Sequence, residues 1–347
     1  KPRTGKGACI LPHGILFRGN AEADIRRNLI KRRIIKAIIS LPPNLFYGTG
    51  IPACIIVLDK ENAAARDGIF MIDASKGFIK DGAKNRLREQ DIQKAMDVFH
   101  DCQEIPGYSR MVPLAEIDAN DYNLNLPRYI DSSDDEVRQD LFAHLNGGIP
   151  DDDLRELDDY WQVFPQLRTQ LFSPSIHAGY SVLNVPSGNI RSLILESPEF
   201  QEFRTAVENR LSRWMQQSRE LMMGLHVGVH AKDFIRTLGD SLRELFHDMH
   251  LVDEYDVYQL LMDYWEEPMR DDVYLIAAEG WIFKTSNLTK TDKKGKEKIT
   301  GWESPLLPEA LLQQHFFPNE VEALHQKRLQ VEQMEAELDS QEEEQLG

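Results

Sequence analysis

The chain has 347 residues, a length that typically folds as about two domains. Hydrophobic residues make up 41% and charged residues 28%, which excludes a wholly disordered chain. The net charge of −17 excludes a general nucleic-acid coat, so any contact with DNA must be local or shared with a partner. Three cysteines exclude a disulfide scaffold and favour a reducing, cytoplasmic setting. No apolar run reaches the roughly 18 residues of a membrane span, and no secretory signal is visible.

Charge is distributed unevenly along the chain. Residues 1–37 contain ten Lys or Arg against two acids, whereas residues 319–347 contain nine acids against two bases. The basic segment is either a solvated surface or a wall that faces phosphates. Lys290–Lys298 is rich in Lys and is expected to be a loop, with a DNA contact as the alternative. Because the chain starts with Lys and enters a strand almost at once, we expect it to begin inside a domain.

The first 60 residues predict an α/β order. Gly7–Pro12 is a short apolar run closed by Pro, which indicates a buried strand. Helical spacing follows from Glu22 to Ile34, with acids in the first turn and bases in the last. Ile34–Leu41 is a second apolar, β-branched run. A strand, a helix and a strand in this order predict a parallel pair with a right-handed crossover.

A third strand is expected at Ile51–Leu58 and a fourth at Ile69–Ile72. Only Pro42–Gly50 joins the second strand to the third, and these nine residues are too few for a helical crossover. The third strand must therefore run antiparallel to the second if the two pair. An α/β sheet that ends in such a reversed hairpin is unusual.

Four motifs lie in order along the first 130 residues. They are Ala8–Gly19 (ACILPHGILFRG), Ile38–Ala53 (IISLPPNLFYGTGIPA), Ile72–Ser75 (IDAS) and Asp121–Ile130 (DYNLNLPRYI). In this order and spacing they resemble the late conserved region of type I restriction–modification DNA methyltransferase subunits, the modification subunits that act on N6 of adenine. The resemblance covers about residues 1–130 and is looser beyond, where such subunits have a mostly helical C-terminal region.

The resemblance implies the C-terminal part of a class I S-adenosylmethionine-dependent, Rossmann-like methyltransferase sheet, followed by a mostly α-helical region. We expect the C-terminal half of the N6-adenine methyltransferase domain at 1–130 and a linker at 131–153. A mainly helical domain with a small β hairpin is expected at 154–300, and a long C-terminal helix for subunit docking at 301–347.

The sequence departs from the family at its catalytic motifs. Such enzymes carry a Gly-rich turn and a following acid that hold S-adenosylmethionine, and an Asn-Pro-Pro-Tyr/Phe loop that holds the target amine. None of these is present, and Leu41-Pro42-Pro43-Asn44 lacks both the preceding amide and the directly following aromatic. We therefore expect no catalytic residue in this chain, S-adenosylmethionine bound mainly by an upstream part, and no activity from this chain alone.

The loop before the third strand is the strongest candidate for a site. In the family an aromatic side chain here packs on the adenine that has been flipped out of the duplex. That position is Phe46, with Tyr47 next to it, and the alternative is that Phe46 caps the sheet core. Gly48, Thr49 and Gly50 either let the backbone approach DNA or form a plain hairpin turn.

Other candidates carry charge or a ring nitrogen. His13 follows the first strand, at the edge where α/β sites gather, although a structural histidine is the alternative. Arg18, Arg26 and Arg27 are candidates for phosphate contacts, with a helix-surface role as the alternative.

Helical patterns dominate the second half. Helices are expected at Ser197–Met223, Asp233–Met249 and Tyr255–Trp265, and a small hairpin at Val273–Ala277 with Gly280–Phe283. The pairs His226/His230 and His247/His250 have helical spacing, but the first lacks the Glu of a zinc-protease helix. We therefore predict no metal site.

Asn319–Leu346 reads as a long, highly charged helix in which Leu324, Val331 and Leu338 are seven residues apart. A solvated helix is the alternative to a coiled-coil seam. In the family the C-terminal helices of the methylating subunit pack on the helices of a specificity subunit, which reads the DNA sequence. The resemblance therefore implies that this helix docks to that subunit.

The resemblance implies DNA, a specificity subunit and a second copy of the modification subunit as partners, with a restriction or translocase subunit as a further candidate and no membrane. Three functions remain open. The chain is part of a type I adenine-N6 methyltransferase, or a non-catalytic module that docks DNA or the specificity subunit. The third is part of a solo or nuclease-fused adenine methyltransferase.

Overall fold

A computed structural model describes residues 1–132, 140–291 and 297–346 of the chain. The chain divides into two compact units. The first comprises Lys1–Gln216 and Leu238–Asp263, and the second comprises Gln217–Thr237 and Tyr264–Gly347.

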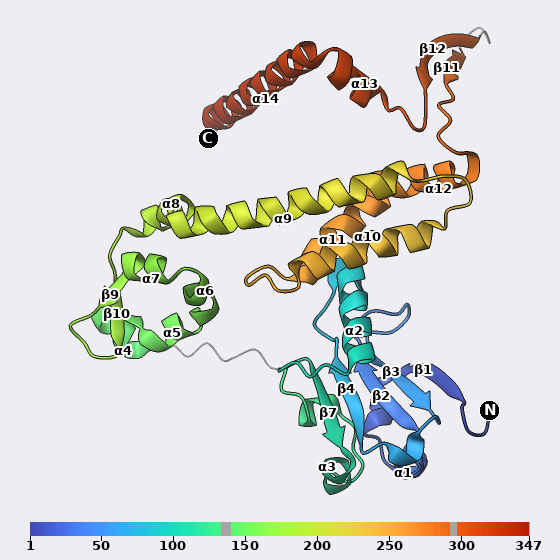
Figure 1. The fold of residues 1–347 in the computed structure, drawn as a ribbon. Helices are drawn as coiled ribbons and strands as arrows, with labels where there is room; N and C mark the ends of the chain where they lie inside the picture. The colour runs from blue at the N-terminus through green and yellow to red at the C-terminus, as the bar shows by residue number, and fades with distance from the viewer. Residues whose placement is uncertain (133–139, 292–296, 347) are drawn as a thin grey trace. The chain divides into compact units, whose positions relative to one another are not determined.

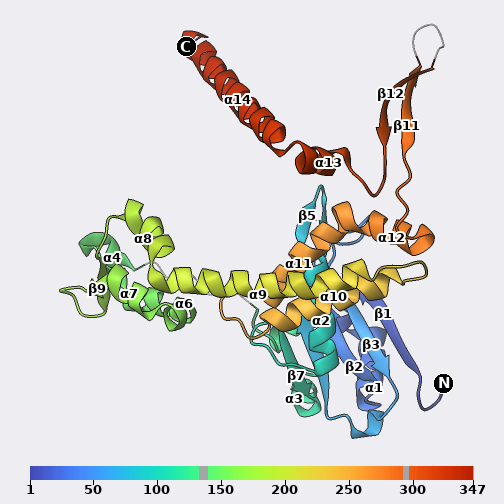
Figure 2. The same ribbon diagram turned by 45° about the horizontal axis from the view of Figure 1, so that its top comes forward.

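The first unit contains a five-stranded sheet in the order β1-β3-β2-β4-β7, whose strands lie side by side in Figures 1 and 2. The strands are β1 (Lys6–Pro12), β2 (Ile35–Ser40), β3 (Ala53–Asp59), β4 (Gly68–Asp73) and β7 (Ser109–Pro113). β2 and β4 pair in parallel, and the other three pairings are antiparallel. The mixed α/β class with a mostly helical C-terminal region is confirmed.

The reversed third strand is confirmed, but the expected parallel pair is wrong. β3 pairs antiparallel with β2, from Ile35 opposite Leu58 to Ser40 opposite Cys54. β3 also pairs with β1, so it lies between the two strands that were expected to pair. β1 and β2 still run in the same direction, because both are antiparallel to β3.

The burial expected for β1 is also wrong. All seven of its residues are exposed, and Ile10 keeps 57% of its surface open. Within the described residues β1 is an edge strand that pairs with β3 alone. An apolar groove of about 240 Å³ also stays open along it, with Leu11 and Ile25 among its lining residues. A short apolar run therefore marked a strand correctly but not its position in the sheet.

Helices cover both faces of the sheet, and strand alternation decides which residue faces which helix. α1 (Asn20–Lys31) and α3 (Leu114–Ala119) supply Ile30 and Ile117 to a core that contains Ile69 and Met71 of β4. The intervening Phe70 and Ile72 point to the opposite face, where they pack with Val98 of α2 (Glu89–Asp101). The sheet is thus the middle layer of three.

The remaining segments of the first unit are short or helical. They include the hairpin strands β5 (Ile79–Asp81) and β6 (Lys84–Arg86), and the three-stranded sheet β8-β10-β9, with bounds Ile149–Pro150, Tyr180–Leu183 and Phe172–Pro174. The short helices are α4 (Leu141–Asn146), α5 (Asp151–Arg155), α6 (Asp158–Val163), α7 (Pro165–Leu171) and α8 (Ile190–Glu196).

The segment 131–153, expected as a linker, contains regular structure where it is described. Asp140 caps α4, because its side chain accepts a hydrogen bond from the backbone N–H of Ala143 at 2.9 Å. β8 and the first residues of α5 follow before residue 154. The domain boundaries expected from the sequence remain predictions.

The three long helices expected in the second half are confirmed as α9 (Pro198–Met223), α10 (Ala231–Phe246) and α11 (Glu254–Tyr264). The start of α9 follows the expected chemistry. Ser197 Oγ accepts a hydrogen bond from the N–H of Phe200, and Pro198 is the first helical residue, where its missing N–H has no consequence. No helix among residues 1–132, 140–291 and 297–346 has the length and apolarity to cross a membrane.

The hairpin expected at Val273–Ala277 and Gly280–Phe283 is wrong. The first segment lies in α12 (Arg270–Glu279), where Val273 and Ile276 are buried three residues apart on one helix face. The hairpin follows instead, as β11 (Ser286–Thr291) and β12 (Glu297–Glu303). Lys290 and Lys298 thus lie in strands rather than in a loop, and residues 292–296 between them lie outside the described part. The chain then forms α13 (Glu309–Phe316) and α14 (Pro318–Leu346).

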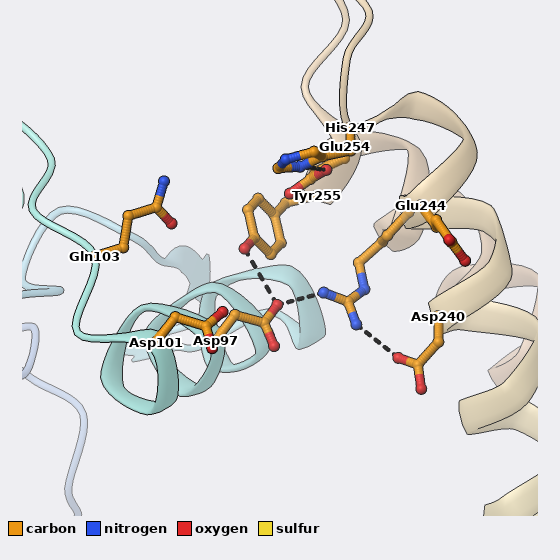
Figure 3. Close-up of a pocket in the computed structure, with 9 residues that line it drawn as sticks. Asp97, Asp101, Gln103, Asp240, Glu244, His247, Glu254 and Tyr255 are labelled. Carbon is orange, nitrogen blue, oxygen red and sulfur yellow. Dashed lines mark hydrogen bonds and ion pairs between the residues drawn. The ribbon is translucent and has the colours of Figure 1, made fainter.

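A polar contact joins α2, which covers one face of the sheet, to the helices α10 and α11 (Figure 3). Asp97 of α2 accepts hydrogen bonds from Arg243 of α10 and, at 3.1 Å, from the hydroxyl of Tyr255 of α11. Arg243 also pairs with Asp240 at 2.6 Å. Burial and the nearby Asp97 carboxylate raise the pKa of Tyr255, so its hydroxyl stays protonated and donates. This contact borders a cavity of about 250 Å³.

Replacing Asp97 by Ala should lower the free energy of unfolding of the chain by about 2 kcal/mol, because the largely buried Arg243 would lose one of its two carboxylate partners. Tyr255→Phe removes a single hydrogen bond and should cost about 1 kcal/mol. Urea unfolding followed by tryptophan fluorescence measures both. Asp101→Ala is the control, because the side chain of Asp101 lines the same cavity and makes no hydrogen bond or ion pair among the described residues. Equal losses for Asp97→Ala and Asp101→Ala would contradict the assignment.

Candidate nucleic-acid interface

The carboxyl ends of three strands meet at one edge of the sheet. β1, β2 and β4 run in the same direction and end at Pro12, Ser40 and Asp73. The N–H of Ala74 donates to the carbonyl of Ser40 at 3.1 Å, which joins the ends of β2 and β4. In α/β sheets this edge is where ligands bind, so it is the first place to search for a site.

His13, a candidate from the sequence, lies at this edge. Its Nε2 is 3.3 Å from Ser40 Oγ, and its backbone N–H donates to the carbonyl of Pro52. Burial lowers the pKa of His13 and the Asp73 carboxylate opposes this only in part, so the ring is neutral at pH 7. Asp73 in turn accepts a hydrogen bond from the hydroxyl of Ser132 at 2.7 Å. These contacts hold the strand ends together.

The loop of residues 41–50 leaves β2 at the same edge. Asn44 and Gly48 both have positive φ, 55° and 80°, which reverses the chain within a few residues. Inside the loop the N–H of Asn44 faces the carbonyl of Gly50 at 3.4 Å, and Thr49 Oγ1 accepts from the N–H of Ile51 at 3.0 Å. Gly48, Thr49 and Gly50 therefore form a compact turn, which agrees with the hairpin-turn reading and leaves a role toward DNA as a prediction.

The two aromatic rings of this loop differ in exposure. Tyr47 is 93% exposed and Phe46 is 36% exposed. Tyr47 is therefore the ring that presents most of its face to a ligand, whereas the sequence placed the stacking position at Phe46 with Tyr47 beside it. Phe46 does not belong to the buried core of the sheet, so the alternative that it caps this core loses support.

Sequence reasoning missed the segment that contacts this loop. Lys84 Nζ of β6 donates to the carbonyls of Phe46 and Thr49, at 2.9 and 3.3 Å. A signal for the hairpin existed, because Asp81-Gly82 spans the end of β5 and the turn to β6, and Gly82 has a φ of 60°. The contact to residues 41–50, about 40 positions away, had no such local signal.

A charged cavity of about 310 Å³ opens beside the end of β4. Arg88 forms a bidentate pair with Asp91, with distances of 2.8 and 2.9 Å. Lys94 lies over the ring of Tyr108, 5.1 Å from its centroid, and burial raises the pKa of that phenol. The cations of this cavity thus already have partners in the fold.

The three arginine candidates separate in the structure. Arg26 is buried and donates to the carbonyls of Tyr122, Ile15 and Arg18, so we correct its assignment from a phosphate contact or helix surface to a structural tie. Arg27 pairs with Asp121 at 3.1 Å and remains partly exposed. Arg18 is exposed. Arg18 and Arg27 stay candidates for phosphate contacts.

The strand ends at this edge do not supply a turn that opens a cofactor-binding helix. At the turn after β1, a Cβ added at Gly14 would lie 2.7 Å from Nε of Arg18, so this side chain lies against the turn. β2 is followed by the loop of residues 41–50, and β4 by the β5–β6 hairpin, and neither continues into a helix that could hold the cofactor. No group of three or more potential metal ligands gathers in residues 1–132, 140–291 and 297–346.

Two of the three docking positions on α14 are described in full. Leu324 is 52% and Val331 47% exposed, so their side chains lie on an open surface of this helix. Leu338 lies within α14, but its side chain is outside the described part. The exposed pair agrees with both a solvated helix and a docking seam, and the choice between them stays a prediction.

Comparison with known proteins finds similarity in the N-terminal segment. Residues 2–138 match the family model described as N-6 DNA Methylase. The chain is 39% identical over 144 residues to the type I restriction enzyme MjaVII methylase subunit of Methanocaldococcus jannaschii, a match that covers 39% of this chain and 25% of that protein. It is 34% identical over 139 residues to the type I restriction enzyme MpnII methylase subunit of Mycoplasma pneumoniae, covering 40% of this chain and 25% of that protein.

A solved structure is similar over the same share of the chain. The type I restriction-modification system methyltransferase subunit from Streptococcus thermophilus is 40% identical, with a TM-score of 0.34, over 37% of this chain and 27% of that one. The matches thus span about a quarter of the length of these relatives. Residues 2–138 are thus similar to the N-6 DNA Methylase family, and over this segment the chain is similar to type I restriction enzyme methylase subunits.

Proposed function

We propose that this chain is part of the modification subunit of a type I restriction–modification system. The complete enzyme would transfer a methyl group from S-adenosylmethionine to N6 of adenine in DNA, and a separate subunit would supply sequence specificity. The similarity of residues 2–138 to type I methylase subunits carries this proposal. Loop residues 41–50 support it, because they present an exposed aromatic ring at the ligand-binding edge of an α/β sheet.

In this proposal the chain contributes contacts to the flipped base. A target adenine must leave the duplex before its amine is accessible, and an aromatic face then stabilises it by about 1–3 kcal/mol. Tyr47, with Phe46 beside it, supplies that face, and Gly48, Thr49 and Gly50 let the protein backbone approach the DNA or the base closely. His13 borders this edge as a structural neighbour, and Arg18 and Arg27 contact phosphates.

The cofactor and the target amine belong to other residues of the assembled enzyme. The 347 residues contain no Asn-Pro-Pro-Tyr/Phe run, and the turn after β1 holds the side chain of Arg18. We therefore propose that this chain carries out no methyl-transfer step by itself and is inactive alone. The same observation favours a second function, a non-catalytic module that docks DNA or a specificity subunit.

Long-read sequencing of genomic DNA tests the proposal. Disrupting the reading frame that encodes this chain in its native cells should remove N6-methyladenine from one sequence motif, and reintroducing the gene should restore it. A control strain verifies that the intact protein is expressed. Unchanged adenine methylation after disruption of an expressed gene would contradict the proposed enzyme and favour the docking module.

Tyr47→Ala should weaken binding of the flipped adenine by the assembled methyltransferase by about 1–3 kcal/mol, because one stacking face is lost. Initial rates on duplex DNA at several DNA concentrations measure the effect as a lower kcat/KM. Tyr47→Phe keeps the ring and is the matched control. The stacking role is wrong if Tyr47→Ala and Tyr47→Phe have the same kcat/KM.

Docking through α14 predicts a separate phenotype. Replacing Leu324, Val331 and Leu338 by Asp should weaken assembly with the specificity subunit, because an apolar seam does not tolerate buried charges. Affinity purification of the tagged subunit from native cells, with partners identified by mass spectrometry, measures the loss. His325→Asp, one position away from the seam, should leave assembly intact. Undiminished recovery of the specificity subunit by the triple variant would refute the docking role.

A further inference from the structure

We infer that the β5–β6 hairpin positions the loop of residues 41–50 for its ligand, with Lys84 and Asn85 as the positioning residues. The inference rests on the proposed function, because the benefit of a fixed loop is a Tyr47 ring that is already in place for a flipped base. The hairpin is a separate element that follows β4, and its strand β5 is labelled in Figure 2.

Four hydrogen bonds connect β6 to the loop. The ammonium of Lys84 donates to the carbonyl of Phe46 at 2.9 Å and to the carbonyl of Thr49 at 3.3 Å. The side-chain amide of Asn85 donates to the carbonyl of Pro43 at 2.7 Å. The backbone N–H of Asn85 donates to the carbonyl of Asn44 at 3.0 Å. The four acceptors span the loop from its start to its turn.

These contacts bracket Tyr47 in the chain. Before Tyr47, Lys84 holds the peptide group between Phe46 and Tyr47 through the Phe46 carbonyl. After Tyr47, it holds the peptide group that follows Thr49 through the Thr49 carbonyl. The Tyr47 side chain itself remains 93% exposed to solvent. A backbone held on both sides of an exposed ring loses less conformational entropy when the ring binds a base, so the loop is preorganised.

The loop has few other restraints. At its start, the N–H of Leu41 donates to the carbonyl of Ala53 at 2.9 Å. Further along, its hydrogen bonds are the 3.4 Å contact between Asn44 and Gly50 and the Thr49 side-chain contact to Ile51. Each of the carbonyls that β6 occupies would otherwise require water as its partner. A charged donor bonded to two carbonyls is stronger than a neutral one, which makes Lys84 the main support.

This geometry separates Lys84 from a direct phosphate contact. An ammonium group has three donors, and two of them are directed at the loop. A phosphate-binding lysine would contribute to the salt dependence of DNA binding, with a slope change of about one for its removal. A positioning lysine changes the affinity without changing that slope.

The test has one arm without DNA and one arm with the assembled enzyme. In the first, hydrogen–deuterium exchange of the purified chain follows the amides of residues 44–51. Lys84→Met should speed their exchange about fivefold or more, Lys84→Arg should restore part of the protection, and Lys80→Met is the matched control on β5. The side chain of Lys80 makes no hydrogen bond or ion pair in the described part of the chain. A melting temperature close to that of the parent shows that Lys84→Met is folded. Asn85→Ala serves as a second variant if Lys84→Met is not folded.

In the second arm, Lys84→Met should lower kcat/KM of the assembled methyltransferase about tenfold, with the salt dependence of DNA binding unchanged. Unchanged exchange in the loop would overturn the positioning role while leaving the proposed function intact. Faster exchange with a kcat/KM equal to that of Lys80→Met would also overturn it, provided that Tyr47→Ala lowers kcat/KM. If Tyr47→Ala has no effect, it is the proposed stacking that fails. A salt slope reduced by about one would assign Lys84 to phosphate instead.

Discussion

The return of β3 between β1 and β2 is the constraint on which the first unit depends. Residues 41–52 contain no helix that could carry a crossover, so the chain turns back and β3 runs antiparallel to β2. Because β3 also pairs with β1, the three strands β1, β2 and β4 keep one direction and end at the same edge. The connection that forces this order is therefore also the loop that presents Tyr47 there, so topology and site have one cause.

Features that depend on neighbouring residues were predictable from the sequence. Four strands, the reversal of the third and the Ser197 cap of α9 follow from local patterns of apolar, Pro and capping residues. Features that depend on distant partners were not. β1 was expected to be buried because its residues are apolar, but its exposure is set by which strands pair with it. Val273–Ala277 has the apolar pattern of a strand over five residues, but it lies in the helix α12, where Val273 and Ile276 are buried on one face.

The residues of the candidate site also fall into two groups, those that a local motif identifies and those whose role depends on distant contacts. The loop of residues 41–50 and His13 were located by motif, and the structure brings them to one edge. Arg26 looked like any surface arginine, yet three carbonyls up to 96 residues away hold it in the core. Lys84 and Asn85 carried no motif at all, because their role consists of contacts to backbone carbonyls about 40 residues away. Every residue has a backbone carbonyl, so such contacts leave no signature in the sequence of the loop that supplies the acceptors.

Photo-crosslinking tests the central claim, that the loop of residues 41–50 contacts the target base. A duplex that carries a photoreactive adenine at the methylated position would be irradiated in complex with the assembled methyltransferase, and the adducts would be mapped by mass spectrometry. The account predicts an adduct at Tyr47 or Phe46, which disappears when the photoreactive base is moved to a neighbouring adenine that is not flipped. Adducts confined to residues outside this loop would contradict it.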